Sequence, residues 1–402
     1  MKIIRFSRGP IAISVAITVV ISVLLAFAGS TQAQLTPSDS SSRPAPTGML
    51  HRTSIIFIQC DGLGYGDFSC YGQTNFQTPN FDKLAAGGIR FDHYTPGDTN
   101  QAIAQAALLT GTSSGEGTES VAELLKSAGY RTGLIGEWQA PGKPWEKGFD
   151  QFLGLMNPES VNYYAPTIWR HTPAAFYNET NKMWMPWKPE YGPNYGGNEI
   201  IFENMYGKQG KYLPDLMLGA IVKNFIRVSQ PDRFNGFQPL FLMVNLPAPR
   251  TATAGKDDFP VPTDAPYSDE PWPQAAKNRA AIITRLDNEI GYLLKDLDQY
   301  KMTNNVVIFL SSSAEPEKFA NSGLKFFHTP ADLKNEGKKD WSAPMIVYWP
   351  GLPTAGKTSD FKWSAKDFLP TAAQIGDART PKDIEGRSIL PILLGQATEA
   401  VP

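Results

Sequence analysis

Two short stretches of this sequence place polar residues where a catalytic or binding site could form. Asp61 follows the continuous apolar run of residues 54–60, and three alternating glycines come directly after it. Asn100 precedes residues 101–111, QAIAQAALLTG, whose composition favours a helix with Asn100 as its N-cap. Ligands gather at the carboxyl ends of parallel strands, and the free N–H groups of a helix start can hold an anion. The alternatives are a carboxylate that merely caps its strand and an ordinary core helix.

Buried strands and helices must position these two stretches. The continuous apolar run at residues 54–60 is typical of a central parallel strand. Further strands are expected at residues 131–135, 240–246, 306–310 and 345–349. Helix signals occur at residues 78–80, 101–111, 120–129, 215–227, 280–300 and 365–375. The clearest helix is 280–300, where apolar residues recur on one face. This alternation of strands and helices is typical of an α/β protein.

Residues 156–213 are rich in Trp, Tyr, Pro and Gly and show little periodicity. We expect long, packed surface loops here, with His171 at the surface. The aromatic side chains could stack on sugar rings, although core packing is the commoner reason for such residues.

Several of these stretches resemble the sulfatase family of the alkaline-phosphatase superfamily. The resemblance begins with residues 54–67 (SIIFIQCDGLGYGD), 78–91 (TPNFDKLAAGGIRF) and 106–111 (AALLTG). It continues through residues 119–138, 148–154, 284–310 and 344–394, so it covers nearly the whole chain after the N-terminal segment. The resemblance implies an α/β fold with a central, mostly parallel sheet sandwiched by helices. It also implies a smaller C-terminal subdomain, which we expect to be truncated or absent.

The nucleophile that this resemblance implies is replaced. In the family, the Cys or Ser of a C-x-P-x-R motif before AALLTG becomes a formylglycine whose hydrate attacks sulfur. That position falls on Gln101 here, and the Pro and Arg positions fall on Ile103 and Gln105. A carboxamide cannot become an aldehyde hydrate. The nearest hydroxyl belongs to Thr99, two residues earlier. We expect this residue to lie outside the N-terminus of the helix.

The calcium site that the resemblance implies is also degraded. The family has two adjacent Asp residues after the first strand, and here they are Asp61 and Gly62. A later Asp and Asn that complete the metal site correspond to Ser312 and Ser313. Hydroxyls are weak ligands for a hard cation that wants six or more oxygens. We therefore expect no cofactor, with calcium as the alternative if the family site survives through Glu315 or Glu317.

Other charged family positions also change type. The Lys and His of a G-K-W-H motif, which contact the sulfate and the nucleophile, correspond to Glu137 and Gln139. A catalytic His after a buried strand corresponds to Arg250, which could bind an anion or simply be solvated. A sulfate-contacting Lys would be Lys334 or Lys338, and the shortened segment leaves both possible.

The N-terminal segment and the composition predict an exported globular protein. Residues 1–33 combine a basic start, an apolar run and small residues suited to cleavage, so we expect a signal peptide, or an uncleaved anchor. Residues 34–50 are predicted to be a flexible linker, and residues 51–396 the sulfatase-like domain. The net charge of −2 over 402 residues carries no nucleic-acid signature. Cys60 and Cys70 are predicted to be isolated thiols, with pairing after export as the alternative.

These observations support two main hypotheses. The first is an exported, periplasmic or extracellular sulfatase-family protein that has lost sulfuric-ester hydrolysis and has a binding or structural role. The alternative is an active hydrolase of sulfate or phosphate esters that uses a non-standard site. The partner in the first hypothesis would be a protein or a glycan, and a sulfated carbohydrate held by the aromatic region is a further possibility.

Overall fold

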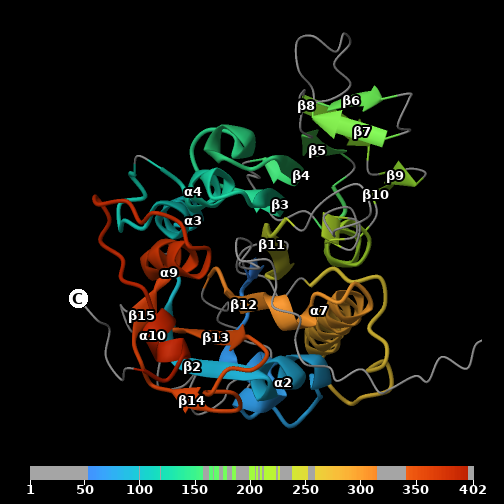
Figure 1. The fold of residues 1–402 in the computed structure, drawn as a ribbon. Coiled ribbons are helices and arrows are strands. Elements are labelled where there is room, and N and C mark those ends of the chain that lie inside the picture. The colour runs from blue at the N-terminus through green and yellow to red at the C-terminus, as the bar shows by residue number, and fades with distance from the viewer. Residues whose placement is uncertain are drawn as a thin grey trace, which may run out of the picture. The chain divides into compact units, whose positions relative to one another are not determined.

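A large mixed β-sheet with the strand order β14-β2-β13-β12-β1-β11-β3-β4-β5-β8 runs through the protein (Figure 1). The computed structural model describes residues 53–98, 100–117, 119–156, 163–165, 167–171, 175–178, 183–186, 199–203, 205–206, 209–210, 212–222, 225–226, 238–251, 259–314 and 341–396. All of them belong to one compact unit, His51–Pro402. The predicted signal and linker, Thr99, Glu315, Glu317, Lys334 and Lys338 lie outside the described residues.

The centre of the sheet is parallel, as the family resemblance implies. β1 (Ser54–Asp61) lies between β11 (Leu240–Pro249) and β12 (Val306–Ser312) and pairs in parallel with both. β3 (Arg131–Trp138) and β4 (Gln151–Met156) continue the parallel order beyond β11. Every residue of β1, β11 and β12 is buried, which explains why their sequences are continuous apolar runs. The predicted fold class is therefore confirmed.

Antiparallel strands flank this parallel centre. On one side β13 (Ala343–Tyr348) pairs with β12, and β2 (Gly88–Thr95) pairs with β13. Two short strands, β14 (Thr358–Ser359) and β15 (Trp363–Ser364), add to β2. The strand expected at 345–349 is thus present, in antiparallel orientation.

The prediction of irregular loops over residues 156–213 is wrong for the described part of that region. β5 (Thr167–His171) and β8 (Glu199–Glu203) extend the main sheet, and β6 (Ala175–Asn178) pairs with β7 (Met183–Pro186). β9 (Met205–Tyr206) and β10 (Gln209–Gly210) form another small pair. Strands this short carry too few alternating positions to show periodicity. His171 is buried and stacks on the Trp145 ring at 4.5 Å between centroids, so its predicted surface position is also wrong.

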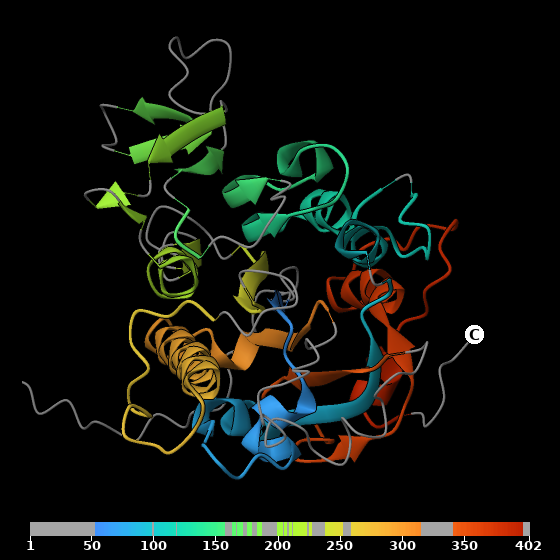
Figure 2. The ribbon, with the colours of Figure 1, turned by 180° about the vertical axis from the view of Figure 1, so that it is seen from behind.

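Helices cover both faces of the sheet (Figures 1 and 2). One face carries α2 (Pro79–Ala86), α5 (Leu213–Asp215) and the 26-residue helix α7 (Gln274–Gln299). The other carries α3 (Gln101–Thr110), α4 (Val121–Ser127), α9 (Phe368–Ile375) and α10 (Leu390–Leu393). Short 3₁₀ helices lie at Tyr65–Asp67, Ser69–Tyr71, Pro144–Lys147, Thr303–Asn305 and Ala365–Asp367.

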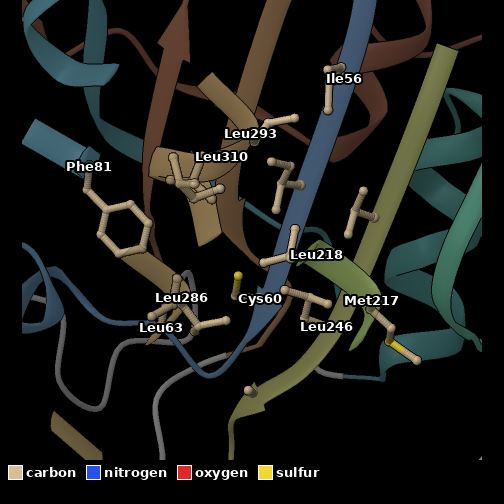
Figure 3. Close-up of a cluster of buried hydrophobic side chains, with 14 of the residues drawn as sticks. Ile56, Cys60, Leu63, Phe81, Met217, Leu218, Leu246, Leu286, Leu293 and Leu310 are labelled. Carbon is tan, nitrogen blue, oxygen red and sulfur yellow. The ribbon is translucent and has the colours of Figure 1, made fainter. Parts of the chain in front are cut away.

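Alternate residues of β1 serve two separate cores. Ile56 and Ile58 belong to the core beneath α7, whereas Ile55 and Phe57 belong to the core beneath α3, α4 and α9. Figure 3 shows part of the first core, including Ile56 of β1, Leu310 of β12 and Leu286 and Leu293 of α7. The period-2 alternation of strand side chains explains this division.

Several predicted boundaries shift. The clearest predicted helix begins at Gln274 rather than at residue 280, while its predicted apolar face is buried as expected. The helix expected at 215–227 instead begins as α5 and continues as a π-helix over Leu216–Val222.

Among the helices of the described ranges, none is long and apolar enough to cross a membrane. Cys60 and Cys70 are both free thiols, which confirms the predicted isolation.

Candidate functional site

The parallel strands deliver the candidate residues to one edge of the sheet. β1 ends at Asp61, β3 ends just after Glu137, and Arg250 directly follows the end of β11. The carboxyl ends of parallel neighbours meet at the same edge, which is where ligands bind in open α/β sheets. The register places Asp61 opposite Pro249, one residue before Arg250.

α3 begins at the same edge. The Asn100 side chain accepts hydrogen bonds from the backbone N–H groups of Ala102, at 2.9 Å, and Ile103, at 3.4 Å, so the predicted N-cap is confirmed. Gln101, the first residue of the helix, donates from Nε2 to Asp61 Oδ2 at 2.6 Å. Ile103 is 37% exposed on the first turn. The helix start therefore presents a carboxamide and an apolar side chain.

Asp61 forms an ion pair across this edge. Its side chain is only 2% exposed, and Arg250 Nη1 lies 3.1 Å from Oδ2. Because burial penalises a charged carboxylate, a cation and an amide donor at the same oxygen stabilise it. Gly62, the next residue, has φ of +87°, a conformation that favours glycine.

A chain of hydrogen bonds joins Asp61 to a second carboxyl group. Gln139 donates from Nε2 to Gln101 Oε1 at 3.2 Å and also hydrogen-bonds the Glu137 carboxyl. The order of contacts is therefore Arg250, Asp61, Gln101, Gln139 and Glu137. Four elements that are distant in sequence contribute to it: β1, α3, β3 and the end of β11.

Glu137 is a buried carboxyl group at this site. It is 5% exposed, and within the described residues no hydrogen-bond partner reaches its Oε1 atom. Burial first, and the nearby charge of Asp61 second, raise the pKa of Glu137 to about 8, while the Gln139 hydrogen bond and Arg250 act in the opposite direction. At pH 7 this carboxyl is therefore mostly protonated.

Gln105 has a structural role that the sequence did not reveal. Its Oε1 accepts from the backbone N–H groups of Gln139, at 2.7 Å, and Ala140, at 2.8 Å. Its Nε2 donates to the backbone carbonyl of Glu137 at 3.1 Å, and Asn245 Nδ2 donates to the same carbonyl at 3.1 Å. The side chain thus ties α3 to the end of β3.

The two serines contact the backbone at the end of β1. Ser312 Oγ lies 3.1 Å from the carbonyl oxygen of Cys60 and 2.7 Å from that of Ala314, within donating distance of both. The backbone N–H of Ser313 donates to the same Cys60 carbonyl at 3.2 Å. Both contacts fasten β12 to β1.

These residues do not fit a calcium ion. Gly62 has no side-chain ligand, the Ser312 hydroxyl points to backbone oxygens, and Arg250 already places a positive charge beside Asp61. Throughout the described part of the chain, no group of three or more His, Cys, Asp or Glu could hold a metal ion. Calcium requires several oxygen ligands and is repelled by a neighbouring guanidinium.

A buried arginine that the sequence did not single out holds the loop after Asp61, with its three alternating glycines, in place. Arg279 of α7 is 1% exposed and binds both carboxylate oxygens of Asp67, at 3.2 Å and 2.5 Å. It also donates to the backbone carbonyls of Gly62, at 3.0 Å, and Pro249, at 3.2 Å. The signal was present, because Arg279 lies on the same helical stripe as Ile283 and Leu286.

A small cavity lies near this site without joining it. Its volume is about 60 Å³, and its lining includes Ala106, Leu109 and Thr110 of α3 together with Trp138. None of the residues in the hydrogen-bonded chain from Arg250 to Glu137 lines it. It has room for a few water molecules only.

Comparison with known proteins identifies the family. The family model described as Sulfatase matches residues 53–378. Arylsulfatase H of Canis lupus familiaris is 25% identical, with 87% of this chain and 74% of that protein covered. An N-acetylgalactosamine-6-O-sulfatase of Bacteroides thetaiotaomicron is 24% identical, with 86% and 77% covered. The chain therefore belongs to the sulfatase family, within the alkaline-phosphatase superfamily.

A solved structure supports the same fold. The PsFucS1 sulfatase from Pseudoalteromonas sp. matches with a TM-score of 0.60 and 21% sequence identity, covering 87% of this chain and 74% of that one. At this identity the likeness shows the fold. The correspondence of Gln101, Gln105, Glu137, Gln139 and Arg250 to family positions stays a prediction, as does that of the residues tied to the metal site, Asp61, Gly62, Ser312 and Ser313.

Proposed function

We propose that this sulfatase-family protein does not hydrolyse sulfuric esters and instead has a binding or structural role. The proposal rests on the position and the hydrogen bonds of the Gln101 side chain. Its carboxamide stands at the start of α3 and is held between Asp61 and Gln139, at 2.6 Å and 3.2 Å. A carboxamide in this position offers neither an aldehyde hydrate nor a usable nucleophile.

The surrounding residues support the same proposal. Arg250 stays protonated at any physiological pH, and Gln139 does not titrate, so neither can act as a general base. General acid–base catalysis alone contributes about 10²–10⁴-fold to a rate. A site without the nucleophile, the histidine and the metal set that the family resemblance implies therefore lacks several independent sources of rate.

The ligand of such a site would be a protein or a glycan. Carboxamides such as Gln101 and Gln139 can exchange hydrogen bonds with hydroxyl groups, and Ile103 offers an exposed apolar contact beside them. A sulfated carbohydrate is a narrower possibility, with Arg250 as its anion partner. Net charge of −2 gives no reason to propose a nucleic acid.

The place of action that we propose is outside the cytoplasm. Residues 1–33 have the basic start, apolar run and small residues of an export signal. The protein would then act in the periplasm or the extracellular space, or remain anchored to the membrane by this segment if it is not removed.

The first experiment is a hydrolysis assay on the purified protein. Chromogenic aryl sulfate and aryl phosphate are offered with calcium and with a chelator, beside a heat-denatured sample and an active sulfatase. We expect no turnover above the denatured sample. Clear turnover would contradict the proposal and favour the alternative, a hydrolase with a non-standard site. In that case Thr99→Ala would test the nearest hydroxyl as the nucleophile.

A further inference from the structure

We infer that the guanidinium of Arg250 is a built-in counter-charge for Asp61 and takes the place of the calcium ion that the family resemblance implies there. The inference concerns the charge balance of the site and does not rest on the proposed loss of hydrolysis. It follows from the mismatch between the residues of this edge and a calcium-binding set.

The burial of Asp61 creates the need for a positive charge. Its side chain is 2% exposed, and a carboxylate removed from water is stable only when it is paired and hydrogen-bonded. Arg250 Nη1, at 3.1 Å, supplies the charge, and Gln101 Nε2, at 2.6 Å, supplies a further hydrogen bond to the same oxygen. A fixed cation and a divalent metal would compete for one carboxylate.

The backbone around Arg250 is built to keep the guanidinium in this place. Gly62 has φ of +87°, and a Cβ atom at this position would lie 3.5 Å from the Cα of Arg250, so the two loops are in contact. The Tyr163 hydroxyl donates to the backbone carbonyl of Arg250. Arg279 donates to the backbone carbonyls of both Gly62 and Pro249 and so joins the loop after β1 to the end of β11.

The loss of the second carboxylate and the presence of the arginine therefore belong together. If an Asp stood at position 62, its carboxylate and that of Asp61 together would favour a metal ion. With Gly62, only the Asp61 carboxylate remains, and the Arg250 guanidinium balances its charge. The ion pair leaves no excess negative charge to attract calcium. The Arg250 side chain is 35% exposed, so its outer edge stays open to solvent.

The test combines thermal unfolding with three variants of the full chain. The wild-type protein is melted in millimolar calcium chloride and in chelator, and we expect the same Tm in both. Arg250→Met leaves Asp61 buried beside an apolar side chain, and we expect its Tm to fall by about 5 °C or more. Arg250→Lys keeps the charge and should recover part of the loss. Asp61→Asn combined with Arg250→Met removes the stranded carboxylate and should also recover part of it.

The comparison of Arg250→Lys with Arg250→Met separates a lost charge from lost packing, because lysine keeps the positive charge whereas methionine keeps only the apolar part of the side chain. Arg285→Met is the matched control, because Arg285 pairs with Asp215 at 2.7 Å with side chains 29% and 33% exposed. We expect that variant to lose little.

Two results would overturn the inference. One is a calcium-dependent rise in the Tm of the wild-type protein, which would mean that Asp61 still serves a metal. The other is an Arg250→Met variant whose Tm matches that of the wild type. Either result is independent of the hydrolysis assay, so failure here and failure of the proposed function can be told apart.

Discussion

At the scale of single residues, Glu137 shows how position changes the behaviour of a side chain. Its sequence context, Gly136-Glu137-Trp138, reads as the end of a strand and says nothing about protonation. In the structure the side chain is 5% exposed, and burial together with the charge of Asp61 raises its pKa to about 8. A carboxyl that holds its proton at pH 7 adds no second negative charge beside the Asp61–Arg250 pair.

Glu137 should make stability depend on pH in a definite direction. Its pKa is higher in the folded protein, at about 8, than the ordinary value of 4.5. Between these values only the folded state holds the proton, so the free energy of unfolding should fall as pH rises, by at most about 1.4 kcal/mol per pH unit. Glu137→Gln should remove this contribution, as measured by denaturant unfolding from pH 4.5 to 8.

The control for this experiment is Glu116→Gln, because Glu116 is exposed on the loop after α3. That variant should keep the wild-type dependence of stability on pH. If Glu137→Gln and the wild type show the same dependence, Glu137 titrates normally in the folded protein and our assignment is incorrect.

At the scale of elements, the candidate site depends on how α3 meets β3. Gln105 makes three hydrogen bonds to the backbone at residues 137, 139 and 140, and this fixes the turn that carries Gln139. The sequence placed Gln105 on a helix and placed Gln139 after a strand, and both placements are correct. Neither pattern could reveal that one side chain joins the two elements.

Truncation of Gln105 should therefore destabilise the protein and disturb the site. Gln105→Ala would leave one buried and one partly buried backbone N–H group, those of Ala140 and Gln139, without their acceptor, and an unsatisfied buried group costs about 1–3 kcal/mol. We expect a loss of about 2 kcal/mol or more in chemical denaturation. Gln374→Ala, at an exposed glutamine of α9 that accepts from Ser388, is the matched control and should change little. Equal stability of the two variants would contradict the role of Gln105.

At the scale of the whole described unit, apolar burial rather than the polar residues at the strand ends holds the sulfatase framework together. β1, β11 and β12 are buried throughout, and helices pack on both sides of them. Apolar burial of this extent is the main source of folding free energy and does not depend on which polar residues end the strands. The framework can therefore persist when the site changes.

The packing of α7 on the sheet gives a test at this scale. Leu286 is 1% exposed in the core that Figure 3 shows, whereas Tyr292 on the same helix is 60% exposed. Leu286→Ala should lower the free energy of unfolding by roughly 2–5 kcal/mol, and Tyr292→Ala by no more than about 0.5 kcal/mol. Calorimetry or denaturant titration measures both. Similar losses for the two would mean that α7 does not dock through this face.

Sequence patterns predicted the local elements of this protein well, because strand and helix signals are carried by neighbouring residues. The run at residues 54–60 forms the central strand β1, and Asn100 caps α3. The helix signal at residues 120–129 corresponds to α4, which begins with a capping box of Ser120 and Glu123. The antiparallel strands β5 and β8 were missed, because short strands gain their stability from partners elsewhere in the sheet.

Motif order and spacing along the chain were enough to predict the fold family and the residues at the strand ends and helix start that form the site: Asp61, Gln101, Glu137, Gln139 and Arg250. The pairing of Arg250 with Asp61, the link that Gln105 makes between two elements and the burial of Glu137 could be seen only in three dimensions. The physical reason is that charge pairing and desolvation depend on distances between residues that are far apart along the chain.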